Sequence, residues 1–237
     1  MSHIFLTTGP SVFSENVHSM IENELNANFI YCLNNKKENL DELCEKADSL
    51  FLGGGRDVFP VTYGSTLLKG ENHENFDIAR DKREVYLIKK FIEQDKGIFG
   101  ICRGLQIYCS AFLGLTLTDA NFSNANVVHS PSSEGIKLSA DEQEFAHTIH
   151  MLGSGEDLHV NSFHHMCVIL PDKLNTIPND VEIVATAELG GSKNPSIIEW
   201  IRDHKNKVNV VQWHPENIYK TNRASQMFLE SIKEMVG

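Results

Sequence analysis

Short apolar runs alternate with amphipathic segments through the first half of the chain, and this alternation constrains the fold more than any other feature. The apolar runs have strand length, and the segments between them carry apolar residues at helical spacing. Strands that alternate with helices form a parallel sheet with helices on both faces. The predicted strands are Ile4–Thr8, Asn28–Leu33, Ser49–Leu52 and Gly97–Ile101, and the predicted helices are Val12–Leu25, Leu40–Ala47, Asp77–Gln94 and Arg103–Leu113.

The second half of the chain has strand-like runs that follow one another closely, as in hairpins added to a sheet. We therefore expect an α/β sandwich of three layers, with a central, mainly parallel sheet and added antiparallel strands. Two long polar connections, 56–76 and 119–156, are predicted, and long loops in a compact domain often carry function. The predicted elements are strands Leu158–Val160, Met166–Leu170, Val181–Ala187, Ser196–Ile201 and Val208–Gln212 and a closing helix, Asn217–Met235.

Length and composition restrict the class of protein. The 237 residues suit a single domain, 1–237, and a net charge of −11 argues against binding nucleic acid. The N-terminus lacks the features of a signal peptide, and no apolar stretch has the length of a membrane span. The five cysteines form no C-x-x-C pair, which argues against a disulfide framework or a cysteine zinc site. We expect a cytoplasmic protein in a reducing compartment.

Cys102 stands between a predicted strand and a predicted helix, with Gly100 and Gly104 two residues away on either side. This is the layout of a nucleophile elbow, a tight and strained turn in which the glycines remove clashes. The turn places the sulfur at the carboxyl edge of the sheet, where α/β proteins bind ligands. The helix N-terminus favours a thiolate, and the amide of Arg103 points at a bound carbonyl oxygen, as half of an oxyanion hole. The alternative is a buried cysteine between two helix-packing glycines.

A cysteine nucleophile needs a base, and His214 is the strongest candidate among eleven histidines because it ends a predicted strand. Pro215 is expected to keep the following backbone extended, so that residues i and i+2 face the same way. Glu216 would then bind one ring nitrogen and leave the other for Cys102, as in a Cys-His-acid triad. The alternative is a strand-end histidine beside a solvated glutamate.

Two further patterns indicate binding sites only weakly. The histidines at 147, 150, 159, 164 and 165 lack a partner carboxylate or cysteine at convincing spacing, so no metal site is predicted. The triple glycine Gly53–Gly55 lacks the lysine and Ser/Thr of a P-loop, so it does not indicate phosphate binding.

Five motifs follow one another along the chain: Gly53–Pro60 with Tyr63 and Gly64; Asp77, Arg80, Asp81 and Glu84; Gly100–Gln106; Val160–His165; and Gln212–Glu216. In these motifs and their order, roughly residues 48 to 217 resemble the class I glutamine amidotransferase superfamily. The chain is most similar to its γ-glutamyl-γ-aminobutyrate hydrolase branch, which is PuuD-like and grouped as peptidase family C26. The resemblance implies a flavodoxin-like fold, and it implies that Asp77, Arg80 and Asp81 pin the 56–76 loop.

The resemblance also implies a reaction and a site. The reaction is hydrolysis of a γ-glutamyl amide through a γ-glutamyl thioester, which releases glutamate and an amine or ammonia and needs no metal or organic cofactor. The implied site has Cys102 as nucleophile, His214 as base, Glu216 as orienter, backbone amides of Gly54 or Gly55 and of Arg103 as oxyanion hole, and Gln106, Asn161, Ser162, Phe163 and His164 as holders of the glutamyl end.

Three departures from the usual pattern of that branch lie near the expected position of the leaving amine: Gly53 in place of proline, Met166 in place of glutamine, and Thr118–Asn121 in place of Tyr-Gln-Asp. The identity of the amine therefore stays open. A stand-alone hydrolase acting on a small-molecule substrate is favoured because no synthase domain is recognised in the chain. The alternatives are a glutaminase subunit that delivers ammonia to a separate synthase partner and an inactive binding module. Whether the protein forms a homodimer is also left open.

Overall fold

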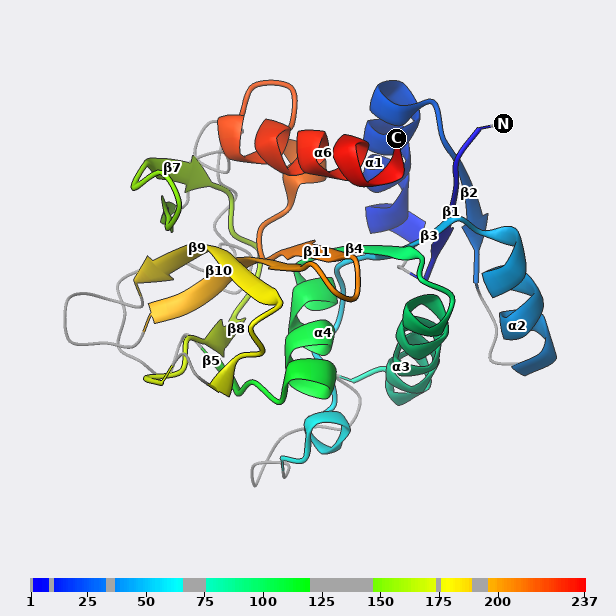
Figure 1. Cartoon of the computed structure of the whole chain (residues 1–237), viewed down its shortest axis with the longest axis horizontal. Helices are drawn as coiled ribbons and strands as arrows, with labels where there is room; N and C mark the ends of the chain where they lie inside the picture. Colours follow the sequence, from blue (N-terminus) through cyan, green and yellow to red (C-terminus); the bar gives the residue numbers. More distant parts are fainter. Residues whose placement is uncertain are drawn as a thin grey trace.

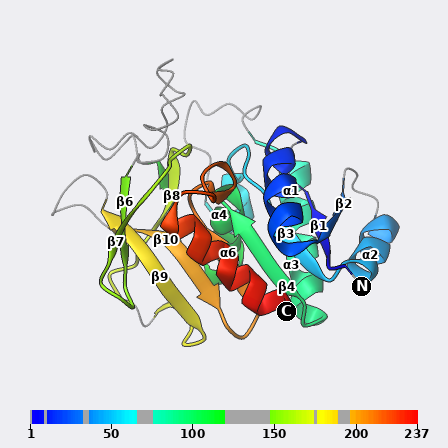
Figure 2. The ribbon, with the colours of Figure 1, turned by 90° about the horizontal axis from the view of Figure 1, so that it is seen from above.

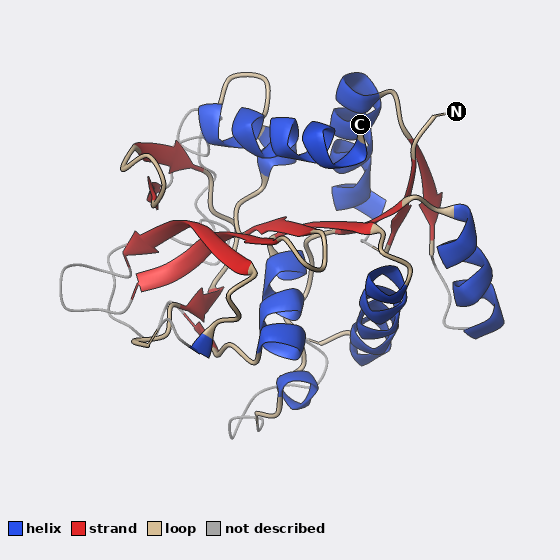
Figure 3. Ribbon diagram, viewed as in Figure 1, coloured by secondary structure: helices blue, strands red, loops and turns tan. Residues whose placement is uncertain are grey.

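The computed structural model describes residues 2–8, 11–32, 37–65, 76–119, 147–173, 176–188 and 196–237. Across these ranges one mixed sheet forms the middle of three layers (Figures 1 and 3). Its parallel core has the strand order β2-β1-β3-β4-β11. The bounds of these strands are Ile4–Thr7 for β1, Asn28–Tyr31 for β2, Ser49–Leu52 for β3, Gly97–Ile101 for β4 and Val208–Val211 for β11.

Helices cover both faces of this core, which confirms the predicted α/β three-layer fold (Figures 1 and 2). Helices α1 and α6 lie on one face and α2, α3 and α4 on the other. The strands read as continuous apolar runs because both of their faces are buried. In β3, Phe51 packs in the core beneath α1 and α6, whereas its neighbours Leu50 and Leu52 pack in the opposite core. The helices are α1, Ser11–Leu25; α2, Lys37–Lys46; α3, Ile78–Glu93; α4, Arg103–Leu113; and α6, Arg223–Val236.

The second half of the chain extends the sheet with antiparallel strands, as predicted. Strand β10 pairs with β11 and β9, β9 pairs with β6, and β6 pairs with β7, while β8 connects β5 to β10. The bounds are Leu117–Asp119 for β5, His147–Met151 for β6, Asp157–Val160 for β7, Met166–Ile169 for β8, Val181–Glu188 for β9 and Ser196–Asp203 for β10.

Three details differ from the sequence predictions. Strand β6 lies inside the segment 119–156 that was predicted as a connection, because only two of its three buried residues, Ile149 and Met151, are apolar. The short β5 was not predicted as a strand. The last helix begins at Arg223 rather than at Asn217, because the Asn222 side chain caps it by accepting a hydrogen bond from the backbone N–H of Ser225, at 3.0 Å. Predictions for Leu33 and for residues 120–146 lie outside the described residues.

Among the described helices, none combines the length and the apolar character that crossing a bilayer requires. The core strands β3, β4 and β11 are adjacent and parallel, and Leu52 pairs with Gly100 while Val211 pairs with Ile101. Their carboxyl ends therefore meet at one edge of the sheet, where Gly53, Cys102 and Gln212 follow directly.

Candidate active site

Cys102 forms a strained turn between β4 and α4. Its backbone angles are φ 50° and ψ −105°, a conformation that residues with a side chain rarely adopt. A Cβ atom added at Gly104 would lie 2.5 Å from the carbonyl oxygen of Leu52, and one added at Gly100 would lie 3.0 Å from Cγ1 of Val210. Gly104 therefore has no room for a side chain and Gly100 has little, in agreement with the predicted elbow geometry.

His214 follows β11 and reaches the Cys102 thiol. Its Nδ1 lies 2.7 Å from Oε1 of Glu216, and a side-chain hydrogen bond links the imidazole to Cys102. Both the imidazole and the Glu216 carboxylate are almost completely buried. Burial lowers the pKa of His214, but the charges of Glu216 and Cys102 and the hydrogen bonds to both raise it, so that the pKa lies well above its usual range. The site thus favours the imidazolium form of His214.

The backbone after His214 differs from the prediction. Residues Pro215–Asn217 form a 3-10 turn, η6, with Pro215 at its first position, rather than an extended segment. Proline favours a first helical position because its fixed φ suits the turn and its missing N–H is not needed there. The turn still brings Glu216 to the His214 ring, so the predicted contact is present, but a 3-10 turn forms it instead of an extended segment.

Asn161 fixes the backbone of His214 at two points. Its Nδ2 donates to the His214 carbonyl oxygen at 2.8 Å, and its Oδ1 accepts from the His214 N–H at 2.9 Å. Asn161 was predicted to help to hold the substrate, but these contacts make it a clamp on His214. The neighbouring Phe163 sets its ring edge-to-face against the imidazole, with ring centroids 5.5 Å apart. The ring of His214 is therefore restrained from two sides.

The other predicted substrate-holding residues lie beside this pair. Gln106, one helical turn after Cys102, donates from Nε2 to the Met166 carbonyl oxygen at 2.8 Å and lies 3.3 Å from Oε1 of Gln212. His164 Nδ1 lies 3.0 Å from the same Met166 oxygen. Ser162 is buried between Asn161 and Phe163 in the segment that follows β7. The structure thus brings all five predicted residues to the Cys102 edge of the sheet.

The side chain of Arg80 holds the glycine loop that follows β3. The guanidinium donates to the carbonyl oxygens of Gly53 at 2.9 Å and of Gly54 at 2.8 Å. In a planar trans peptide the N–H points opposite to the preceding carbonyl, so the amides of Gly54 and Gly55 face away from Arg80. Gly55 has a φ of 142°, which favours glycine. The loop that replaces the usual proline with Gly53 is therefore anchored.

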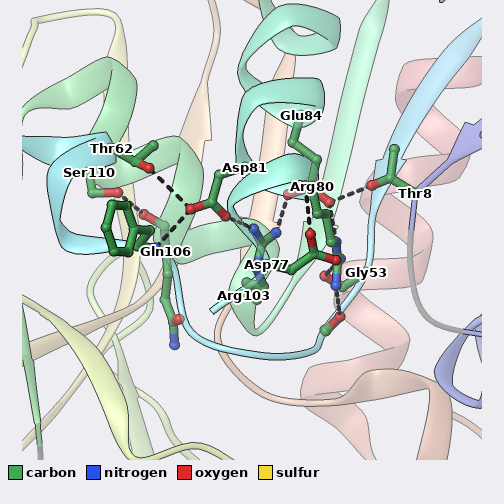
Figure 4. A network of polar contacts seen from close by, with 12 residues as sticks. Thr8, Gly53, Thr62, Asp77, Arg80, Asp81, Glu84, Arg103, Gln106 and Ser110 are labelled. Carbon is green, nitrogen blue, oxygen red and sulfur yellow. Dashed lines mark hydrogen bonds and ion pairs between the residues drawn. The ribbon is translucent and has the colours of Figure 1, made fainter. Parts of the chain in front are cut away.

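A buried ion network connects this loop to the elbow (Figure 4). The Arg103 guanidinium pairs with the carboxylates of Glu84 and Asp81, and Glu84 also accepts from Arg80 at 2.7 Å. Burial raises the pKa of Glu84, but the charges of Arg103 and Arg80 lower it to about 2, so the carboxylate stays ionised. Two cations thus face two carboxylates beneath the site.

The same network holds the start of the loop that follows. Asp81 accepts from the Phe59 N–H at 2.8 Å and from the Thr62 hydroxyl at 3.1 Å, while the Asp77 carboxylate caps α3 by accepting from the Arg80 N–H at 2.9 Å. The predicted pinning of the 56–76 loop is therefore observed at Phe59 and Thr62, within its described residues.

Two ion-pair clusters near the site were not predicted. His147 lies 3.1 Å from the buried carboxylate of Glu199, and His165 lies 3.0 Å from Asp57 and 3.3 Å from Asp119. Each cluster joins residues far apart in sequence, so spacing gave no signal for either. Within the described residues, no group of three or more His, Cys, Asp or Glu side chains could hold a metal ion.

The remaining cysteines lie in the core. Burial raises the pKa of the Cys44 thiol to about 11 and that of Cys167 to about 12, and it also raises the pKa of Cys109. Cys32 is buried as well. The surroundings of Cys44, Cys109 and Cys167 disfavour thiolates.

A family model and several known proteins are similar in sequence to this chain. Residues 2–216 match the family model described as Peptidase C26. A glutamine amidotransferase-like protein of Lactococcus lactis, YvdE, is 30% identical over 197 residues, which span 82% of this chain and 77% of that protein. A glutamine amidotransferase-like protein of Rickettsia prowazekii is 26% identical over 240 residues, which span 84% of this chain and 80% of that protein.

Two solved structures share the fold. A glutamine amidotransferase from Thermotoga maritima has a TM-score of 0.54 and 15% identity, and the match covers 98% of this chain and 85% of that one. The glutaminase domain of Trypanosoma brucei CTPS with bound acivicin has a TM-score of 0.55 and 11% identity, and the match covers 99% of this chain and 94% of that one.

Proposed function

The chain belongs to the peptidase C26 family of glutamine amidotransferase-like hydrolases, which act on amide bonds, and from this premise we propose that it cleaves a γ-glutamyl amide through a thioester on Cys102. One observation carries the proposal: a cysteine in a strained elbow is hydrogen-bonded to His214, whose other nitrogen contacts the buried Glu216. This is the arrangement of a nucleophile, a base and an orienting acid.

The proposed reaction has two halves. In the first, the Cys102 thiolate attacks the γ-carbonyl carbon, and the C–N bond breaks while His214 Nε2 gives its proton to the leaving amine. In the second, His214 takes a proton from water, the hydroxide attacks the thioester, and the C–S bond breaks to release glutamate. Glu216 stabilises the imidazolium at both stages and fixes the ring orientation. His214 regains from water the proton that it gave to the amine, so the proposed reaction needs no cofactor.

Backbone amides are proposed to stabilise the oxyanion. Arg80 holds the carbonyls of Gly53 and Gly54, so the amides of Gly54 and Gly55 turn away from it. The Gly54 Cα carries no side chain where it approaches both Cys102 and His214. The amide of Arg103, at the start of α4, provides the second donor. A donor of this kind contributes about 3–4 kcal/mol to the transition state in a well-studied hydrolase.

Gln106 and the segment 161–164 are proposed to surround the glutamyl end of the substrate. Asn161 would act indirectly, because its side chain is engaged with the His214 backbone. The leaving amine would lie towards Met166 and Thr118–Asp119, where the chain departs from the γ-aminobutyrate hydrolase pattern. A cysteine nucleophile has to stay reduced, so we place the reaction in a reducing compartment such as the cytoplasm.

A panel of γ-glutamyl amines and glutamine, with glutamate release as the readout, tests the proposal. The lone chain should turn over at least one γ-glutamyl amide, and Cys102→Ser should abolish turnover without changing the melting temperature. The electrophile diazo-oxo-norleucine should label Cys102 in the wild type and much more slowly in His214→Ala. Turnover that survives in Cys102→Ser, or labelling no faster at Cys102 than at Cys109, would contradict the mechanism. Glutamate release only after a synthase is added would indicate a glutaminase subunit, and wild-type inactivity with every partner would indicate a binding module.

A further inference from the structure

We infer that Glu199 is a positioning residue which, through His147 and Gln212, holds the glutamyl-binding side of the site formed by Gln106 and His164. The inference rests on the proposed function and adds to it a residue remote from the reacting atoms. Glu199 is fully buried, and it lies where the pairing of β10 with β9 shifts register between Ile198 and Trp200.

A register shift of this kind re-aims a side chain, and such irregularities are frequent next to active sites. The Glu199 carboxylate is aimed at β6, where its Oε1 lies 3.1 Å from Nε2 of His147. Its second oxygen, Oε2, has no hydrogen-bond partner among the residues that the structure describes. A buried carboxylate costs several kcal/mol unless it is paired, so an apolar residue would suit packing alone better.

Two chains of contacts lead from Glu199 to the site. Directly after β11, the Gln212 N–H donates to the Glu199 carbonyl oxygen at 2.8 Å, so the backbones of the two residues are paired. The Gln212 side chain in turn contacts Gln106, with Oε1 3.3 Å from Nε2. Gln106 is one turn of α4 after Cys102.

The second chain passes through the histidines. The rings of His147 and His164 are edge-to-face with centroids 6.2 Å apart. His164 and Gln106 meet on the same acceptor, the carbonyl oxygen of Met166, at 3.0 Å and 2.8 Å. The contacts thus close a ring of five residues, Gln106, Gln212, Glu199, His147 and His164, which we call the polar ring. Two of its links are made through backbone groups, namely the hydrogen bond between Gln212 and Glu199 and the Met166 carbonyl oxygen that Gln106 and His164 share.

The polar ring contains neither Cys102 nor His214. Loss of the Glu199 charge should therefore loosen Gln106 and His164 while it leaves the thiol and imidazole in place. Substrate binding should weaken more than the chemical step, which separates this role from a catalytic one. It should also weaken only for ligands that carry the amino-acid end of the substrate.

Asp203 provides a matched control for a merely structural role. It lies on the same strand, is equally well buried, and accepts a hydrogen bond from the Tyr108 hydroxyl at 2.6 Å. Asp203 pairs in register with Val208 at the start of β11, whereas His214 follows the end of that strand. The control therefore lies at the opposite end of the sheet from the site.

The test compares Glu199→Gln, which keeps the side-chain size and removes the charge, with Asp203→Asn. For Glu199→Gln we expect a KM for the γ-glutamyl amide that is raised about tenfold, with little change in kcat. Labelling of Cys102 by diazo-oxo-norleucine, which carries an amino-acid end, should slow similarly, while labelling by iodoacetamide, which lacks one, should keep its rate. Asp203→Asn should lower the melting temperature and leave KM and both labelling rates unchanged.

Three outcomes decide the inference. An unchanged KM in Glu199→Gln, or equal slowing of both electrophiles, would overturn it. If Glu199→Gln does not fold, His147→Gln should show the same rise in KM. A normal KM in His147→Gln would also overturn the inference. A wild-type chain that neither hydrolyses γ-glutamyl amides nor reacts with diazo-oxo-norleucine would overturn the proposed function itself, which distinguishes the two failures.

Discussion

Replacing Gly54 by alanine would push a methyl group between Cys102 and His214, the proposed nucleophile and base. The added Cβ would lie 2.8 Å from Cε1 of His214, 3.5 Å from its Nε2 and 3.8 Å from Cβ of Cys102. Non-bonded carbon atoms rest about 3.5–4.0 Å apart, so the imidazole or the loop must move by about 1 Å. The prediction depends on which of the two can yield.

Neither side is free to yield. The imidazole is tied to Glu216 at 2.7 Å, and its backbone is held at both polar groups by Asn161. The glycine loop is tied by two hydrogen bonds from Arg80, which is itself buried in the ion network. We therefore expect the glycine loop and the imidazole each to take up part of the displacement, with the His214 ring moving away from Cys102. A misplacement of about 1 Å costs on the order of 100-fold in rate.

The assay is kcat for glutamate release, measured with the melting temperature of each variant. Gly54→Ala should lose about two orders of magnitude in kcat, and overpacking should lower its stability by about 1–3 kcal/mol. Gly153→Ala is the control, because an added Cβ there meets nothing within 4 Å. Wild-type turnover in Gly54→Ala would refute the argument that the loop and the imidazole are both rigid.

Two pH-dependent effects follow from the histidines. Glu216→Gln removes a charge that raises the pKa of His214, so the alkaline limb of the kcat–pH profile should move to lower pH, and turnover should slow less than in His214→Ala. The hydrogen bond to Asp57, opposed by burial and aided by the charge of Asp119, raises the pKa of His165 from 6.5 to about 9. Its protonated form therefore stabilises the fold fully below pH 6.5, and this stabilisation is lost as the pH rises through about 9. Asp57→Asn should lower the pKa of His165 in an NMR titration and flatten the fall of the unfolding midpoint over that range, and an unchanged titration would contradict the pairing.

The elements that could be predicted are those whose signal is local. Strands β3 and β4 are buried on both faces, so they appear as continuous apolar runs. The elbow at Cys102 depends on neighbours two residues away, and the sequence therefore predicts it. Strand β6 has apolar side chains at only two of its five positions, Ile149 and Met151, and its third buried residue is His147. Its pattern therefore does not distinguish it from a polar connection.

Some contacts between distant segments could not be predicted. The two-point clamp of Asn161 on His214 and the pair of His147 with Glu199 each join residues more than fifty positions apart. The contact of Glu216 with His214 was predicted from an extended backbone, although a 3-10 turn produces it. Alternation along a strand and a tight turn can both return residue i+2 to residue i, so the pattern alone does not fix the backbone.

The buried ion network explains how the strained backbone geometry of the elbow is maintained. The conformation of Cys102 costs on the order of 1–3 kcal/mol and persists only when its surroundings over-determine it. The next residue, Arg103, is fixed by Glu84 and Asp81, and Glu84 also binds Arg80. Removing one member would leave an uncompensated buried charge, at a cost of about 3–5 kcal/mol.

The cost of breaking this network exceeds the strain, so the turn is held in place. Arg80 also binds the carbonyls of Gly53 and Gly54, which makes the glycine loop and the elbow parts of one rigid unit. Because the two proposed donors of the oxyanion hole sit on these two segments, the charges beneath the site set the distance between them. A buried ion pair is weak evidence for added stability, but in the proposed mechanism its geometry would determine where the carbonyl oxygen of the substrate is bound.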